Sequence, residues 1–258
     1  MSFMNGLDPS FFGLLLIGII TGLLAAILGI GGGLLMVPTL TYWGATPLQA
    51  VATSLVGIVL ASASGTYQNW RMKQLNLTQV LLLAPPAMLM TEVGVWIANA
   101  LPPKALLISF AALQVIAIYL ISLKRKLRPA QSTKTSIEQR IYQSEGIGLL
   151  AGVLSGLFGV GGGIVMVPLQ MLFLGETIKE AVRTSLGAIL LISSWAIARH
   201  AASGNVLWLA GICLGSGALC GAQIGARLLF KLPEKLVTLL FRGLLLLMAG
   251  YMISKAFA

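Results

Sequence analysis

Apolar residues occupy long runs along the chain, and short polar gaps separate them. In each half, one apolar run reaches a glycine-rich break, a short apolar segment follows, and three longer runs come next. The longer runs approach the ~20 residues that a helix needs to cross a bilayer. The short segments cover only about half of that thickness, because a helix rises ~1.5 Å per residue. The pattern predicts an all-α integral membrane protein with about eight to ten helical segments.

The two halves show the same order of segments. We expect a first membrane repeat over residues 1–123, a basic linker over 124–144 and a second membrane repeat over 145–258. The predicted segments are 10–28, 34–44, 48–67, 78–99 and 105–123 in the first half, and 146–158, 164–174, 181–199, 206–229 and 236–254 in the second.

Three sequence blocks recur in the same order in both halves, at an offset of 130 or 131 residues. Chance is a poor explanation for three aligned blocks, so the pattern indicates an internal duplication of nearly the whole chain. The blocks are GIGGGLLMVP at Gly29–Pro38 and GVGGGIVMVP at Gly159–Pro168, TSL at Thr53–Leu55 and Thr184–Leu186, and L-P-x-K at Leu101–Lys104 and Leu232–Lys235.

The composition supports a lipid environment. Hydrophobic residues make up 57 % of the chain and charged residues 9 %, whereas a soluble domain carries about 25 % charged residues. The net charge of +10 does not indicate nucleic-acid binding, because the basic residues cluster in short gaps between apolar runs, as membrane topology demands. A lipid bilayer is therefore an expected partner. The other expected partner, a small anionic substrate, follows from the glycine-rich breaks described below.

The basic residues also predict the orientation of the halves. The linker is rich in lysine and arginine, which places it on the cytoplasmic side. If each half holds an odd number of crossings, the repeats are inverted, and only Lys104, Arg199 and Lys255 of the 17 basic residues lie outside. A parallel arrangement moves more of them outside. The inverted arrangement is therefore the expectation.

The glycine-rich breaks are the candidate substrate site. Each glycine costs a helix roughly 1 kcal/mol relative to alanine, which suggests a use for the bare backbone. A short helix that opens at such a break presents free N–H groups and a positive dipole end, which bind anions. Inverted copies would bring two such ends together. The alternative is close packing of helices through small residues. Candidate substrate-binding residues are Gly31, Gly32, Gly33, Gly161, Gly162 and Gly163. Gly29, Pro38, Gly159 and Pro168 are expected as helix-break residues, with the prolines at the far end or a kink of each short helix.

The doubled GxGGGxxxVP motif, the TSL blocks and the L-P-x-K turns resemble the TauE/SafE sulfite exporter family of membrane permeases over almost the entire chain. The resemblance implies export or exchange of a small sulfur-containing anion, such as sulfite or an organosulfonate, through the bacterial inner membrane. It does not specify the substrate, because family members are assigned to several. Carried over by position, it adds Thr53, Ser54, Thr184 and Ser185 to the glycines and prolines as candidate site residues.

Three further polar residues lie in or beside apolar runs. Glu92 is the only acid deep inside such a run, which makes it a candidate proton carrier; the alternative is a paired or protonated structural carboxyl. Arg183 precedes the second TSL block and could add positive charge near the anion path, or it could simply follow the positive-inside rule. His200 ends a run, and we expect it at the surface.

Enzymatic function is poorly supported by the available side chains. The chain has one histidine, one aspartate and no HExxH motif, so a zinc protease signature is missing. One membrane acid cannot form an aspartyl dyad. We expect no catalytic residues, no metal site and no cofactor. An anion channel, an assembly factor and an intramembrane enzyme remain as alternatives to a transporter, and a homodimer is compatible with the sequence without being indicated by it.

Overall fold

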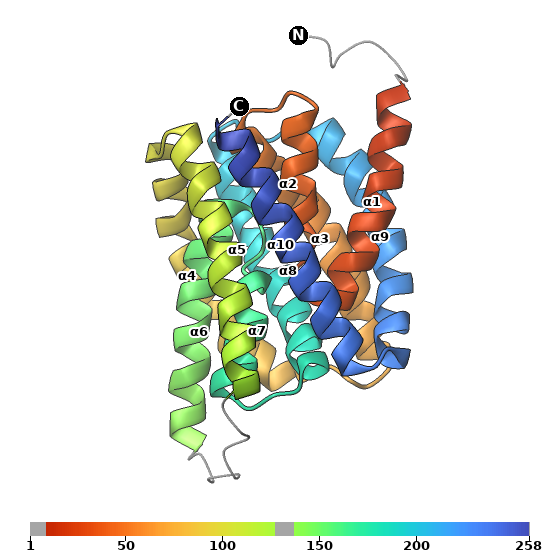
Figure 1. Cartoon of the computed structure of the whole chain (residues 1–258), viewed down its shortest axis with the longest axis vertical. Coiled ribbons are helices and arrows are strands. Elements are labelled where there is room, and N and C mark those ends of the chain that lie inside the picture. Colours follow the sequence, from red (N-terminus) through yellow and green to blue (C-terminus); the bar gives the residue numbers. More distant parts are fainter. Residues whose placement is uncertain (1–8, 127–136, 258) are drawn as a thin grey trace.

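The computed structural model describes residues 9–126 and 137–257. Over these residues the chain forms ten α-helices and no strand (Figure 1), which confirms the predicted all-α fold. The helices are α1 (Pro9–Leu28), α2 (Gly33–Tyr42), α3 (Pro47–Arg71), α4 (Leu77–Ala100), α5 (Pro103–Lys126), α6 (Ile137–Phe158), α7 (Gly163–Phe173), α8 (Ile178–Ala202), α9 (Trp208–Lys231) and α10 (Glu234–Phe257).

Six of the helices in the described part of the chain are long and apolar enough to cross a membrane: α3, α4, α5, α8, α9 and α10. By contrast, α2 and α7 have only 10 and 11 residues, or about half a bilayer at ~1.5 Å per residue. The indole of Trp43, which follows α2, lies beside Gly13 near the start of α1. The first glycine break therefore reverses the chain, and α2 returns toward the end where α1 begins.

The two halves exchange their first helices, so that each first helix packs on a helix of the other half. The α1 helix packs along α9, and α6 packs along α4, so the first helix of each half is docked on the other half. Between these pairs, α3 contacts α8. The start of α1 and the end of α10 lie at one end of the molecule, whereas α5 ends and α6 begins at the other (Figure 1). The predicted inversion of the two halves fits this arrangement and stays a prediction.

Small residues allow α1 to approach α9 closely, and α6 to approach α4. A methyl group built on Gly22 of α1 would overlap the backbone of Ala218 in α9. A methyl group built on Gly152 of α6 would overlap the backbone of Ala87 in α4. Such close backbone contact is the usual packing mode of membrane helices, since lipid provides no hydrophobic drive for their association.

The helices α3 and α8 begin with the same type of N-terminal cap. The Thr46 hydroxyl accepts a hydrogen bond from the N–H of Gln49, whose side-chain oxygen accepts one from the N–H of Thr46. Thr177 and Glu180 form the same capping box at the start of α8. This reciprocal arrangement satisfies two of the free N–H groups at each helix start.

Some helix boundaries differ from those that the hydropathy pattern predicts. The α6 helix begins at Ile137 rather than near residue 146, so the end of the segment assigned to the linker is helical. Residues 127–136 of that linker lie outside the described residues. A helix can extend beyond its apolar run, because its backbone hydrogen bonds also form in water. The hydropathy pattern detects only the apolar part of the helix, so it places the start of α6 too late.

The outer surface is apolar. Large side chains such as Leu89, Trp96, Leu239 and Leu247 are exposed on different helices. A water-soluble monomer rarely exposes extended apolar surface of this kind. The exposed side chains therefore match a multi-pass membrane protein.

Candidate functional site

The two glycine breaks share one backbone conformation. In each break three glycines have positive φ, a region that other residues rarely adopt. The third of these glycines forms the N-cap of the half-length helix in both halves. The φ values are 70° for Gly29, 72° for Gly31 and 93° for Gly32, and 61° for Gly159, 70° for Gly161 and 75° for Gly162.

The two breaks lie directly against each other. A methyl group built on Gly33 would overlap the carbonyl oxygen of Gly159 and lie 2.8 Å from the Cα of Val160. Reciprocally, a methyl group on Gly163 would overlap the carbonyl oxygen of Gly29 and lie 2.8 Å from the Cα of Ile30. The structure thus brings the two motifs together, and the close packing considered as the alternative to ligand binding is present at this contact.

Both half-length helices retain free donors at their first turn. The first backbone bonds of α2 run from Leu35 and Met36 to the carbonyl of Gly32, each at 3.1 Å. In the described part of the chain, the N–H groups of Gly33 and Leu34 find no acceptor, as expected at a helix start. The same holds for the first two residues of α7.

The two prolines do not end their helices, and their role as kinks stays a prediction. Pro38 lies inside α2, and Pro168 lies inside α7. Each helix continues past its proline, because a proline removes one backbone donor and need not end a helix that neighbouring helices hold. The glycines alone mark the breaks.

Matching stripes of buried residues on α3 and α8 flank the breaks. Their members recur every four residues, which places them on one face of each helix. A methyl group on Gly31 would lie 2.9 Å from Ile58 and 3.0 Å from Ile189, so both isoleucines cover the first break. Ile189 covers Gly161 in the same way. The stripes are Ser54, Ile58 and Ser62 on α3, and Ser185, Ile189 and Ser193 on α8.

The serine hydroxyls of these stripes differ in their partners. The Ser54 hydroxyl lies 2.8 Å from the carbonyl of Gly159 in the opposite break and 2.7 Å from that of Val51. The Ser62 hydroxyl donates to the carbonyl of Ile58 at 2.5 Å. The Ser193 hydroxyl is fully buried without a partner among the described residues, and a methyl group on Gly161 would lie 3.1 Å from it. Ser193 thus offers an unused donor beside the second break.

The threonines of the TSL blocks occupy different surroundings. The Thr53 hydroxyl accepts a hydrogen bond of 2.9 Å from the N–H of Leu207 and so ties α3 to the start of α9. Thr184 is buried, and it lines a cavity at the linker end of the molecule. Of the two threonines, Thr53 therefore has a structural partner on another helix, and Thr184 is a buried lining residue of the cavity.

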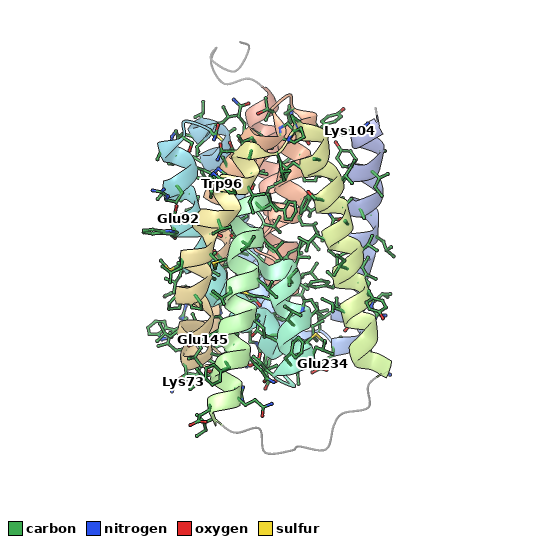
Figure 2. The ribbon with its side chains drawn as sticks, turned by 90° about the vertical axis from the view of Figure 1, so that its left-hand side faces the viewer. Lys73, Glu92, Trp96, Lys104, Glu145 and Glu234 are labelled. Atoms are coloured by element: carbon green, nitrogen blue, oxygen red, sulfur yellow. The ribbon has the colours of Figure 1, made fainter. Side chains whose placement is uncertain are left out.

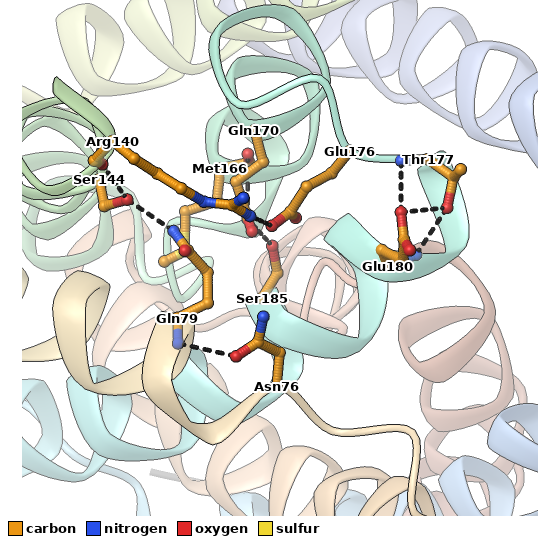
Figure 3. Close-up of polar contacts among 10 residues, drawn as sticks. All are labelled: Asn76, Gln79, Arg140, Ser144, Met166, Gln170, Glu176, Thr177, Glu180 and Ser185. Atoms are coloured by element: carbon orange, nitrogen blue, oxygen red, sulfur yellow. Dashed lines mark hydrogen bonds and ion pairs between the residues drawn. The ribbon is translucent and has the colours of Figure 1, made fainter. Parts of the chain in front are cut away.

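A polar network connects helices near the linker end (Figure 3). The Gln170 amide on α7 donates to the Ser185 hydroxyl at 2.8 Å and to the Met166 carbonyl at 3.2 Å. The Gln79 amide on α4 donates to the Ser144 hydroxyl on α6 at 2.7 Å. This second bond joins the two halves of the chain.

The cavity at the linker end has a volume of about 570 Å³. Three basic and two acidic residues line it, which leaves an excess of positive charge. Arg140 forms an ion pair with Glu176 at 3.4 Å. The charged lining residues are Lys73, Arg140, Glu176, Glu180 and Arg183.

Glu92 lies away from the breaks, on the outer face of α4 (Figure 2). It accepts hydrogen bonds from Arg199 at 2.7 Å and from Trp195 at 3.1 Å. Its side chain is 39 % exposed, so it is not the deeply enclosed acid that the run suggests. Since helix periodicity decides which face a residue occupies, a position inside an apolar run does not by itself place it in the interior. The geometry matches the paired carboxyl considered as the alternative to a proton carrier.

The expectation of a surface histidine is wrong. His200 is fully buried, and its Nε2 lies 3.1 Å from the carbonyl of Gly156 on α6. It shares the buried face of α8 with Ile189 and Ser193. Packing against α6 decided this burial, and the position of the residue in its run did not reveal it.

Sequence reasoning missed several residues at the centre. Ile58 and Ser62 match Ile189 and Ser193 at the same offset as the TSL blocks, so a continued comparison of the halves could have found them. Gln170 has no polar counterpart in the first half, and the repeat gives no signal for it. Across the described side chains, no group of three or more His, Cys, Asp or Glu could hold a metal ion.

Comparisons with known proteins agree with the membrane fold. Residues 14–252 match the family described as "Sulfite exporter TauE/SafE". The chain is 28 % identical to the "Probable membrane transporter protein YunE" of Bacillus subtilis (strain 168), over 95 % of this chain and 98 % of that protein. It is 26 % identical to the "Probable membrane transporter protein YdhB" of the same organism, over 86 % and 91 % of the two chains. A "Probable membrane transporter protein" of Xylella fastidiosa (strain Temecula1) is 26 % identical over 93 % and 94 %. No solved structure matches the chain.

Proposed function

The chain belongs to the TauE/SafE family of sulfite exporters, and from this membership and the geometry of the two breaks we propose that it exports a small sulfur-containing anion. Sulfite or an organosulfonate is the substrate class, and the bacterial inner membrane is the location. The two breaks form the central anion site, with Ser193 as an adjacent donor.

The mutual contact of the two breaks carries this proposal. Two helix starts, each equivalent to roughly half a positive charge, meet beside an unpartnered buried hydroxyl. An anion in the membrane interior requires such donors, because water is not available to solvate it. Neutral donors also suit a transporter. A full buried cation would hold the anion more tightly and slow its release.

The same contact favours alternating access over a channel. Gly33 and Gly163 leave no room for a methyl group between the breaks, and Ile58 and Ile189 cover them. A continuous pore through this region would need the helices to separate. In the proposed cycle, the two halves rock about the glycine contact, and the isoleucines uncover the site toward one side at a time.

Orientation completes the proposal. The linker end faces the cytoplasm, and the repeats over residues 1–123 and 145–258 are inverted. Figure 2 labels Lys73 and Glu234 near the linker end and Lys104 at the opposite end. The cavity with excess positive charge opens at the linker end, where an exported anion would enter from the cytoplasm.

Sulfite flux in proteoliposomes tests the function. Vesicles containing the protein should take up labelled sulfite faster than empty vesicles, and sulfite inside the vesicles should accelerate that uptake. Such acceleration is the signature of a carrier and is absent from a channel. A panel of unlabelled sulfonates, sulfate, phosphate and chloride then ranks competitors. If no sulfur-containing anion is transported or competes, the proposed substrate class is wrong. If flux occurs without acceleration, the channel alternative holds.

A further inference from the structure

We propose that the cavity at the linker end captures the transported anion before it reaches the breaks, and that Lys73 selects for negative charge there. The proposal deepens the proposed function and depends on it. The ligand class is a small oxyanion such as sulfite.

The first observation is the backbone of Lys73. Its φ is 57°, and within residues 9–126 and 137–257 it is the one residue other than glycine with positive φ. Lys73 follows the end of α3, where its N–H donates to the carbonyl of Trp70 at 2.9 Å. The N–H of Gln74 donates to the carbonyl of Asn69 at 3.0 Å. This turn normally has glycine at the left-handed position.

The second half builds the same turn with glycine. Gly204, the counterpart of Lys73, has a φ of 70°. Its N–H donates to the carbonyl of Ala201 at 3.0 Å, and the next N–H donates to the carbonyl of His200 at 3.3 Å. The fold therefore does not require a side chain at this position of the turn. A lysine in an unfavourable backbone conformation therefore points to a use for its side chain.

The third observation is the charge around Lys73. Of the two carboxylates in the cavity, Glu176 pairs with Arg140, and Glu180 accepts hydrogen bonds from the N-cap residue of α8. In the described part of the chain, Lys73 has no carboxylate partner. The Nε of Arg183 is buried without a hydrogen-bond partner. Glu180 also attracts the Arg183 guanidinium. Lys73 has no such ion pair among the described residues, so it supplies the positive charge that the cavity carboxylates leave unpaired.

The lining of the cavity connects with the helices that reach the breaks. Thr184 lines it, and the next residue, Ser185, is hydrogen-bonded to Gln170 of α7. Both α7 and α8 continue from there to the contact between the breaks. A volume of about 570 Å³ holds roughly twenty waters at ~30 Å³ each. The anion can therefore enter hydrated and be attracted by charge before it loses water at the breaks.

The competing explanation is that Lys73 serves only to orient the chain by the positive-inside rule. That role requires a cytoplasmic charge and no particular cavity. Three variants separate the two effects. Lys73→Asn removes the charge and tolerates the left-handed backbone. Lys73→Gly removes the charge and relieves the backbone. Lys73→Arg keeps both the charge and the unfavourable conformation.

The experiment measures KM and kcat for sulfite flux at low and high salt, with correct insertion verified for each variant. We expect Lys73→Asn and Lys73→Gly to raise KM about three- to tenfold at low salt with kcat unchanged, and Lys73→Arg to retain the wild-type KM. The difference should shrink near 0.5 M salt, because screening shortens the reach of the charge. The melting temperature should instead depend on how well each residue tolerates the positive φ at position 73. We therefore expect Lys73→Gly to have the highest melting temperature. Wild-type KM in the two neutral variants at low salt would overturn the proposal.

A binding measurement keeps this inference separate from the proposed function. Sulfite should raise the melting temperature of the detergent-purified wild type, and this rise should be smaller in Lys73→Asn. If the wild type binds sulfite in this way but shows no flux, transport fails while capture stands. If sulfite is transported but Lys73→Asn matches the wild type in both KM and melting shift, capture by Lys73 is wrong. Absence of both binding and flux in the wild type contradicts both proposals.

Discussion

Gly33 of the first half lies against the carbonyl of Gly159 in the second half, closely enough that a single methyl group would overlap it. The same relationship holds with the halves exchanged, between Gly163 and Gly29. The glycines of the two motifs therefore form a close backbone contact between the two halves. Packing and anion binding are not exclusive here, because the backbone contact is what brings the two helix starts together.

The first prediction concerns this contact. Gly33→Ala and Gly163→Ala should each lower the free energy of unfolding by about 1–3 kcal/mol, because the added methyl overpacks a filled contact. The control is Gly243→Ala in α10, where the added methyl meets nothing within 4 Å and should stabilise the helix by up to about 1 kcal/mol. Unfolding in detergent measures all three. Equal stability of Gly33→Ala and Gly243→Ala would mean that the breaks are not tightly packed.

A second prediction distinguishes ligand binding from packing. Ser193→Ala removes an unpartnered hydroxyl without filling space, so stability should change little and the KM for sulfite should rise about three- to tenfold. Its counterpart Ser62 already donates to the carbonyl of Ile58, so Ser62→Ala should leave the KM near the wild-type value. Flux assays at several sulfite concentrations make the comparison. An unchanged KM in Ser193→Ala would remove this residue from the site.

Glu92 provides the third prediction. Because its carboxylate is engaged by Arg199 and Trp195 on the outer face, Glu92→Gln should retain the wild-type dependence of sulfite flux on a proton gradient. Arg199→Gln is the matched variant that removes the other partner of the ion pair. Both should lower the melting temperature modestly. If Glu92→Gln alone abolishes the response to the gradient, the role of proton carrier is correct despite the pairing.

The fourth prediction tests the orientation of the halves. In a chain whose native cysteines, Cys213 and Cys220, are replaced, Thr78→Cys should react with an impermeant thiol reagent only from the cytoplasm. Ser203→Cys should react only from outside. Thr78 lies at the start of α4 and Ser203 follows the end of α8, so they flank the corresponding α3–α4 and α8–α9 loops of the two halves. A parallel repeat would expose both on one side. Labelling of both from the same side would contradict the inversion.

Much of this architecture follows from local sequence. Helix formation and membrane insertion depend on the apolar content of one segment at a time, and the cost of glycine in a helix is also local. The apolar runs and the duplicated motif were therefore sufficient to predict helices, two breaks and two half-length segments, all of which the structure contains. Family membership could be inferred for the same reason, since the motifs are contiguous.

The tertiary structure decided which faces are buried and what they meet. The seating of Gly33 on Gly159, the pairing of Glu92 with Arg199 and the burial of His200 all join helices that are distant in the sequence. A position in an apolar run does not determine which side of its helix faces a neighbour, because the period of 3.6 residues only defines faces relative to one another. The packing of one half on the other assigns those faces to protein, cavity or lipid.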